Sequence, residues 1–381
     1  MAEHVSRVPG SRSIARTVAG FYLLVAFEFF YMASPFAAYF YSIYGPGLTF
    51  LNGIPALAWL SDTFLPHVVM ETSSPILKTI RMLGPVFAVT GAAVFLVAAV
   101  PVYYAKLKRS GPVTGGLYKF IRHPQYAGLI VWGMGLVILW PRTIALLLFV
   151  AMLFVYFFLA RIEEQECERR FGIRYLKYRN ATGMFLPFRV HALPSFPGLP
   201  RSRLNRIAVV VTLYCCVSLA ALGLSAQMKT WSLQNLYTHS TGNAVFISVT
   251  AMSADSLARL VACTLSHPDV RSQLLQGRKG TRYVNYVMPD DLYLMEVPML
   301  QRGTSHGNIG LSYGDSDPRY LKIIITEAVT RDAGSGVEML RSVVERIPLM
   351  EIRIDPAIPA VLDVCRLPRD SALHGLPFPV F

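Results

Sequence analysis

The chain has 381 residues, of which 53% are hydrophobic and only 15% are charged, well below the roughly 25% that is typical of soluble domains. Its net charge of +13 arises entirely from residues 1–228, because residues 229–381 carry equal numbers of acidic and basic side chains. The basic residues flank long apolar runs, a pattern typical of membrane insertion and not of nucleic-acid binding. We therefore expect a protein whose partner is the lipid bilayer, with no nucleic-acid partner.

Five apolar runs predict an all-α polytopic membrane core of about five transmembrane helices, since a spanning helix needs about 20 apolar residues. The runs are residues 17–44, 85–104, 126–139, 143–160 and 207–226. Arg7, Arg12 and Arg16 precede the first run, which is interpreted as an uncleaved signal anchor. Glu28 inside that run faces a polar cavity or is solvated near an interface. Residues 47–60 are short and contain Pro55, and are predicted to be re-entrant or interfacial.

Basic residues also predict the orientation of the chain. The N-terminus, residues 106–122 and residues 161–206 are all basic, and the positive-inside rule places all three in the cytoplasm. This requires two crossings before residue 106, which supports an interfacial position for residues 47–60. One more crossing at residues 207–226 then places the C-terminal domain on the opposite side.

The uneven distribution of charge and apolar runs also predicts two domains. Residues 1–228 form the membrane domain, and residues 233–381 are predicted to be a soluble α+β domain of unknown role. Alternating and β-branched residues predict strands at 244–250, 282–288, 292–297, 321–326 and 350–354, and helices at 256–265 and 336–346. The five cysteines have no metal-site spacing, so no metal is expected, but export of the domain would permit a Cys263–Cys365 disulfide. The polar loop at 303–317 either binds a ligand or is flexible.

The residues that carry chemistry lie at the two ends of one predicted hairpin. Residues 114–128 contain Tyr118 and then Arg122-His123-Pro124-Gln125-Tyr126. The 35 residues from Tyr126 to Ala160 can cross and return, at about 25 Å each way. Arg122 and His123 should therefore meet Glu163 and Glu164 at one membrane face. A cluster of solvated charges at a helix end would be the simpler interpretation.

This arrangement resembles a known family. The order Arg-His-Pro-x-Tyr-x-Gly, hairpin, Glu-Glu, then Phe-Gly-x-x-Tyr-x-x-Tyr ending at Tyr178 is similar to the isoprenylcysteine carboxyl methyltransferase and phospholipid N-methyltransferase superfamily. The resemblance covers the motif core, residues 103–187. It implies an integral membrane methyltransferase with an S-adenosylmethionine pocket. Matching positions would line that pocket with Tyr118, His123, Pro124, Gln125, Tyr126 and Glu163, and with less similar residues at 110–113.

The resemblance also indicates which residues would bind the methyl acceptor. Prenylcysteine-type members have an arginine where this chain has Leu159, and Arg161 lies two residues further on. Arg161, Tyr175 and Tyr178 are therefore the candidate substrate-binding residues. The methyl acceptor stays open between a lipophilic carboxylate, a lipid amine and a small thiol.

The residue types suit this chemistry. S-adenosylmethionine carries a carboxylate that suits Arg122 and His123, and an ammonium or ribose hydroxyls that suit Glu163. Its sulfonium can lie against a tyrosine face. An amine or thiol acceptor needs a general base, for which Glu164 and His123 are available. Arg122, His123 and Glu164 are therefore the candidate catalytic residues.

The sequence is also compatible with two other functions. Sterol-type reductases share the Arg-His-Pro-x-Tyr-x-Gly element and bind a nicotinamide cofactor, but the Glu163-Glu164 pair and the tyrosine-rich tail favour the methyltransferase. A non-catalytic membrane anchor that presents the C-terminal domain would bind no nucleotide cofactor. The presence of Arg122, His123 and Glu163 argues against such an anchor.

Overall fold

The computed structural model describes residues 50–51, 53–65, 72–108, 112–187, 202–275, 280–292, 319–332 and 334–367. Several predictions lie outside these residues: the first apolar run with Glu28, the three N-terminal arginines, nearly all of the strand at 292–297 and the polar loop at 303–317.

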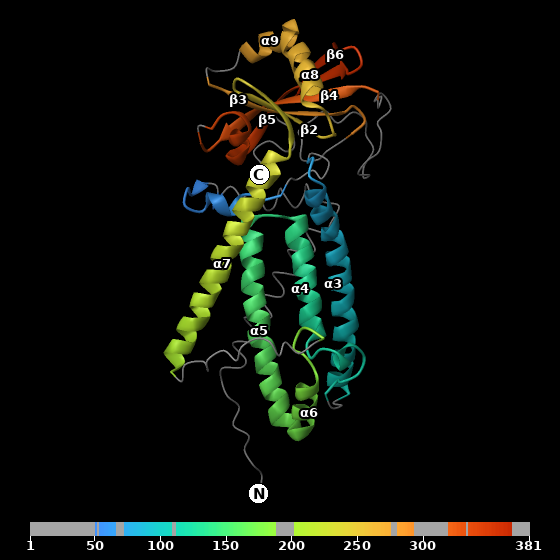
Figure 1. Cartoon of the computed structure of the whole chain (residues 1–381), viewed down its shortest axis with the longest axis vertical. Coiled ribbons are helices and arrows are strands. Elements are labelled where there is room, and N and C mark those ends of the chain that lie inside the picture. The colour runs from blue at the N-terminus through green and yellow to red at the C-terminus, as the bar shows by residue number, and fades with distance from the viewer. Residues whose placement is uncertain are drawn as a thin grey trace.

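Four long helices form the elongated part of the molecule: α3 (Pro75–Leu107), α4 (Pro124–Leu139), α5 (Thr143–Phe171) and α7 (Arg203–Gln234) (Figure 1). Among the described residues, three helices are long and apolar enough to cross a membrane, at Pro75–Val102, Thr143–Phe171 and Leu204–Gln234, while α4 is apolar but has only 16 residues. The chain is therefore an integral membrane protein. The expected number of five spans stays a prediction.

Helices α3 and α4 pack backbone against backbone, because glycines line their contact. A Cβ atom added to Gly91 of α3 would lie 2.3 Å from the backbone nitrogen of Trp132, and one added to Gly135 of α4 would lie 2.4 Å from that of Ala88. A Cβ on Gly128 would lie 2.6 Å from the nitrogen of Phe95. Gly128 thus lies in close backbone contact with α3. Small residues permit such close helix contacts in membranes.

The predicted hairpin is present. Pro124 occupies the first turn of α4, and the chain breaks at Trp140-Pro141-Arg142. Helix α5 continues beyond the apolar run that ends at residue 160 and stops at Phe171 before Gly172, whose φ is +53°. Glu163 and Glu164 are therefore helical. The short helix α6 (Ile173–Ala181) follows.

The C-terminal domain is a six-stranded sheet in the order β1-β2-β3-β4-β5-β6. Only β2 and β3 are parallel, and all other neighbours are antiparallel. The strands are β1 (Tyr237–Thr241), β2 (Ala244–Ser248), β3 (Arg282–Pro289), β4 (Leu321–Thr330), β5 (Val343–Asp355) and β6 (Ala360–Arg366). Four of the five predicted strands are therefore confirmed, and β1 and β6 were not predicted.

Apolar side chains cover both faces of this sheet. Helices α8 (Ala254–Ser266) and α9 (Pro268–Leu275) pack on one face around Phe246 and Ile323. The end of α7 and the 3-10 helix η4 (Gly336–Arg341) pack on the other face around Ile247 and Ile324. The predicted helix at 336–346 is wrong beyond residue 341, because β-branched Val343 starts β5 and pairs with Thr330 of β4.

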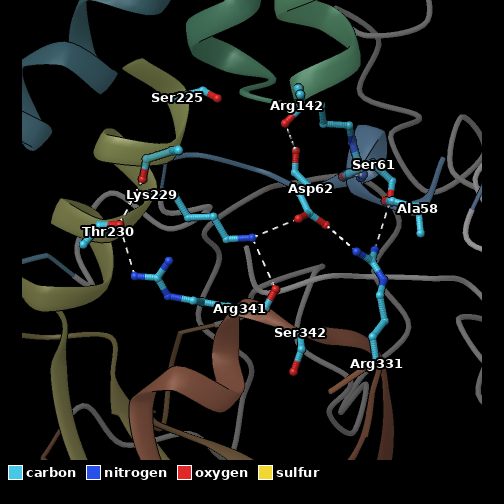
Figure 2. A network of polar contacts seen from close by, with 12 residues as sticks. Ala58, Ser61, Asp62, Arg142, Ser225, Lys229, Thr230, Arg331, Arg341 and Ser342 are labelled. Atoms are coloured by element: carbon cyan, nitrogen blue, oxygen red, sulfur yellow. Dashed lines mark hydrogen bonds and ion pairs between the residues drawn. The ribbon is translucent and has the colours of Figure 1, made fainter. Parts of the chain in front are cut away.

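A segment before α3 joins the sheet to the tip of the α4–α5 hairpin. The Asp62 carboxylate lies 3.1 Å from Lys229 Nζ of α7 and 2.9 Å from Arg331 Nη1, which follows β4 (Figure 2). The backbone of this segment accepts bonds from the hairpin tip: Arg142 donates to Ser61 O and the Thr143 amide donates to Asp62 O. The described part of residues 47–60 contains helical residues at 50, 51 and 53, then turns and the start of the 3-10 helix η1 (Ala58–Ser61), and none of these described residues forms a spanning helix.

The proposed disulfide is absent, because Cys263 and Cys365 are both free thiols. Cys263 Sγ of α8 lies 3.1 Å from Pro359 O, and Cys365 Sγ of β6 lies 3.2 Å from Asp363 Oδ2. Each thiol therefore has its own polar neighbour in the domain.

Candidate active site

The predicted site residues gather at the end of the helices that is remote from the sheet, where α6 lies (Figure 1). The 3-10 helix η3 (Gly116–Lys119) and the loop to His123 lead into α4, and the last turns of α5 return to the same place. An isolated bridge between Ile121 and Gly183 brings in the segment that follows α6. The prediction that both ends of the hairpin meet at one mouth is confirmed.

His123, Tyr126 and Glu163 form the centre of the cluster. His123 Nδ1 lies 3.5 Å from Glu163 Oε2, and the Tyr126 hydroxyl donates to Glu163 Oε1 at 2.6 Å. The His123 and Tyr126 rings are stacked, with centroids 5.7 Å apart. The His123 side chain is buried, whereas that of Glu163 is 49% exposed, so the carboxylate is accessible to a ligand from outside.

Arg122 and Glu164 form a buried pair beside this centre. Arg122 Nε donates to Glu164 Oε1 at 2.6 Å, and the Glu164 side chain is only 3% exposed. Arg122 Nη1 donates to the carbonyl oxygens of Arg179 and Thr182. Both side chains therefore connect the loop, α5 and the end of α6, a geometry that differs from the predicted role of Arg122 in binding a cofactor carboxylate.

His123 is favoured in its charged form. Burial alone would lower the pKa of His123, but hydrogen bonds and charge from Glu163 and then Glu164 outweigh burial and raise the pKa above its ordinary value. Nε2 of His123 lies 3.4 Å from Glu164 Oε1, so the imidazole lies between the two carboxylates. An imidazolium held in this way presents positive charge beside the accessible Glu163.

Two tyrosines connect the chain segments around the candidate site through hydrogen bonds. The Tyr178 hydroxyl donates to Tyr118 O at 2.7 Å, and the Tyr118 hydroxyl donates to Ala98 O of α3 at 3.0 Å. Burial raises the pKa of Tyr178 to about 12, so its phenol stays protonated as a donor at neutral pH. Tyr175 is buried and its ring lies 5.8 Å from that of Tyr178. These contacts are structural, and they leave the substrate roles predicted for Tyr175 and Tyr178 untested.

The remaining predicted residues lie at the edge of the cluster. Pro124 is buried in the first turn of α4, and Gln125 is half-buried next to it. Arg161 is 56% exposed and its Nη1 lies 4.0 Å from Glu164 Oε2. Arg161 is thus near the cluster but turned largely to the outside.

Three residues that sequence reasoning missed complete the cluster. Tyr156 is fully buried in α5 and stacks on Tyr126 with centroids 5.2 Å apart. Its position, seven residues and hence two turns before Glu163, is a signal that places it on the same helix face. Met184 and Phe185, from the segment after α6, pack against the apolar cluster that contains these two rings. Neither residue belongs to a motif, so nothing in the sequence pointed to them.

Known proteins match the part of the chain that contains this cluster. Residues 86–168 match the model of the isoprenylcysteine carboxyl methyltransferase (ICMT) family. This segment of the chain is similar to the ICMT family. The match contains α4, most of α5 and the four residues His123, Tyr126, Glu163 and Glu164.

Curated relatives match the same part. Protein-S-isoprenylcysteine O-methyltransferase A of Arabidopsis thaliana is 32% identical over 80 residues, which is 20% of this chain and 40% of the relative. The enzyme of that name from Saccharomyces cerevisiae is 32% identical over 77 residues, and that from Schizosaccharomyces pombe is 36% identical over 77 residues; each match covers 20% of this chain and 32% of the relative. The chain thus spans less than half the length of these relatives. No solved structure matches.

Proposed function

We propose that this protein is an S-adenosylmethionine-dependent methyltransferase that acts on a lipophilic acceptor at the membrane face. The observation that carries the proposal is the pairing of His123 and Glu163, 3.5 Å apart although forty residues separate them, in the segment shared with the ICMT superfamily. Glu163 is half-exposed while its neighbour Glu164 is buried against Arg122. Glu163 is therefore the carboxylate that a bound molecule can reach.

The donor set fits the methyl donor. S-adenosylmethionine, when bound, supplies a methyl group activated by a sulfonium centre. The Glu163 carboxylate binds a cationic or hydroxyl group, and the His123 imidazolium beside it holds that carboxylate in position. The faces of Tyr126 and Tyr156 provide aromatic surface beside them. The buried rings exclude water from this side of the site, and alignment of the two reactants is the main task left to the protein.

The geometry bears on which of the candidate catalytic residues can act as a general base. Glu164 is held by Arg122 inside the protein, so it is poorly placed to receive a proton from an acceptor. His123 is held in its protonated form between Glu163 and Glu164, so it is also poorly placed to act as a base for an amine or a thiol, whereas a carboxylate acceptor needs no base. The relatives' names make a prenylated cysteine the first acceptor to test. Phosphatidylethanolamine is the matching test of a lipid amine.

The orientation is part of the same proposal. The site and the C-terminal sheet lie at opposite ends of the helices (Figure 1), so a cytoplasmic site would place the sheet on the other side of the membrane. Basic residues around the site favour the cytoplasmic side for it. A C-terminal reporter fusion that is active only outside the cytoplasm supports this orientation, and a cytoplasmic C-terminus would overturn it.

Transfer of a labelled methyl group by the purified full chain tests the function. We expect S-adenosylmethionine to label a prenylated cysteine analogue, and Glu163→Gln to lower the rate about 100-fold, because the neutral amide removes the charge that binds and orients the donor. Glu166→Gln is the matched control, since Glu166 is exposed on the same helix and pairs only with Arg170 among the described residues. Equal rates for Glu163→Gln and the wild type would contradict the proposed role.

A further inference from the structure

The segment after α6, residues 182–187, crosses directly over the loop that carries His123. Gly183 O accepts from the Arg122 amide at 2.8 Å, and Met184 O accepts from the His123 amide at 3.1 Å. We call residues 182–187 the strap. Because backbone atoms make these bonds, the strap keeps its place whatever side chains it carries.

Arg122 holds the strap from a second direction. Its Nη1 donates to Thr182 O and, at 2.8 Å, to Arg179 O, while its Nε is held by Glu164 of α5. The Thr182 hydroxyl donates to Tyr178 O at 2.8 Å and closes the end of α6. The strap, α5 and the His123 loop are thus tied together by one guanidinium, which makes Arg122 a positioning residue.

The strap brings apolar side chains to the polar centre. The Phe185 ring lies 6.0 Å from the His123 ring, tilted by 47°, and it packs with Met184 against the apolar cluster that contains Tyr126 and Tyr156. Phe185 is half-buried, so part of its ring stays accessible next to His123. A lipophilic acceptor must bring an apolar group to the polar centre, and the Phe185 ring offers a partly accessible apolar surface next to His123.

We propose that Phe185 is a specificity-determining residue of this site, whose ring contacts the apolar group of the methyl acceptor. This inference rests on the proposed methyltransferase function. It assigns the strap to the acceptor, whereas His123 and Glu163 serve the methyl donor. Removing the ring should therefore weaken acceptor binding and leave donor binding unchanged.

The test separates the two sides of the site. For Phe185→Ala we expect KM for a farnesylated cysteine analogue to rise about tenfold or more, as the loss of one buried aromatic contact implies, with kcat nearly unchanged. Affinity for S-adenosylhomocysteine should stay within about twofold, which also reports that the variant is folded. Phe185→Leu should restore most of the acceptor affinity. Leu186→Ala, at an exposed position of the same strap, is the matched control and should resemble the wild type.

Direct binding of the farnesylated analogue, measured without methyl donor, makes the outcome independent of turnover. An unchanged KM and analogue affinity in Phe185→Ala, with wild-type binding of S-adenosylhomocysteine, would overturn the role of Phe185 alone. A fall in donor affinity with an unchanged KM for the acceptor would assign Phe185 to the donor and overturn it too. A wild-type protein that binds neither molecule would overturn this inference and the proposed function together.

Discussion

Replacing Gly91 with valine is expected to separate α3 from α4 and to abolish the folded membrane domain. The added Cβ would lie 2.3 Å from the nitrogen of Trp132 and 2.7 Å from the oxygen of Gly128, and backbone atoms cannot turn aside as a flexible side chain can. Overpacking costs up to about 3 kcal/mol where only side chains must move, and more is expected here. Since α4 begins directly after His123, the site should be lost with the helix contact.

Thermal unfolding of the protein in detergent, followed by size-exclusion chromatography, measures this effect. We expect a clear fall in Tm and in the yield of monodisperse protein for Gly91→Val. Gly223→Val on α7 is the matched control, because no atom lies within 4 Å of a Cβ added there. A Gly91→Val protein with the Tm of the Gly223→Val protein would show that α3 and α4 do not make this contact.

Replacing Asp62 with alanine is expected to loosen the C-terminal domain from the helices. Asp62 is the carboxylate between Lys229 and Arg331, whose side chains are 12% and 26% exposed, and its loss leaves two cations near each other (Figure 2). Breaking a largely buried ion pair in this way costs about 3 kcal/mol. Arg341 adds a third cation nearby, because Lys229 Nζ donates to Arg341 O and the Arg341 guanidinium donates to Thr230.

Limited proteolysis and hydrogen exchange of the full chain measure this loosening. In Asp62→Ala we expect faster exchange in η1 and at the tip of the α4–α5 hairpin, where Asp62 O accepts from the Thr143 amide. Glu166→Ala is the control, since its pair with Arg170 is exposed and contributes at most about 0.5 kcal/mol. Unchanged exchange at the hairpin tip would mean that this ionic contact does not hold the two parts together.

The parts of the fold that sequence reasoning predicted are those with a strong local pattern. Apolar runs and the break at Pro141 predicted the α4–α5 hairpin, and its length predicted that His123 meets Glu163. Strand β6 was missed because it is largely exposed on both faces, so its alternation is weak. The prediction of a helix at 336–346 was wrong for a different reason. Val343 pairs with β4, and local propensity does not predict such a long-range contact.

The sequence predicted which residues lie in the candidate site, but not which role each of them has. Two adjacent glutamates look alike in sequence, yet Glu164 turns into the protein toward Arg122 and Glu163 turns toward His123 and the outside. That difference depends on the helical phase of α5, which an apolar run ending at residue 160 does not specify. Phe185 enters the site only through backbone pairing of the strap, which has no sequence signature.

Titration calorimetry of the purified full chain with S-adenosylhomocysteine and, separately, with reduced nicotinamide cofactor tests the central claim most directly. We predict saturable binding of S-adenosylhomocysteine at one site per chain, its loss in His123→Ala, and no binding of the nicotinamide cofactor. Binding of the nicotinamide cofactor in place of S-adenosylhomocysteine, or undiminished binding by His123→Ala, would contradict the claim that the two ends of this hairpin form a methyl-donor site.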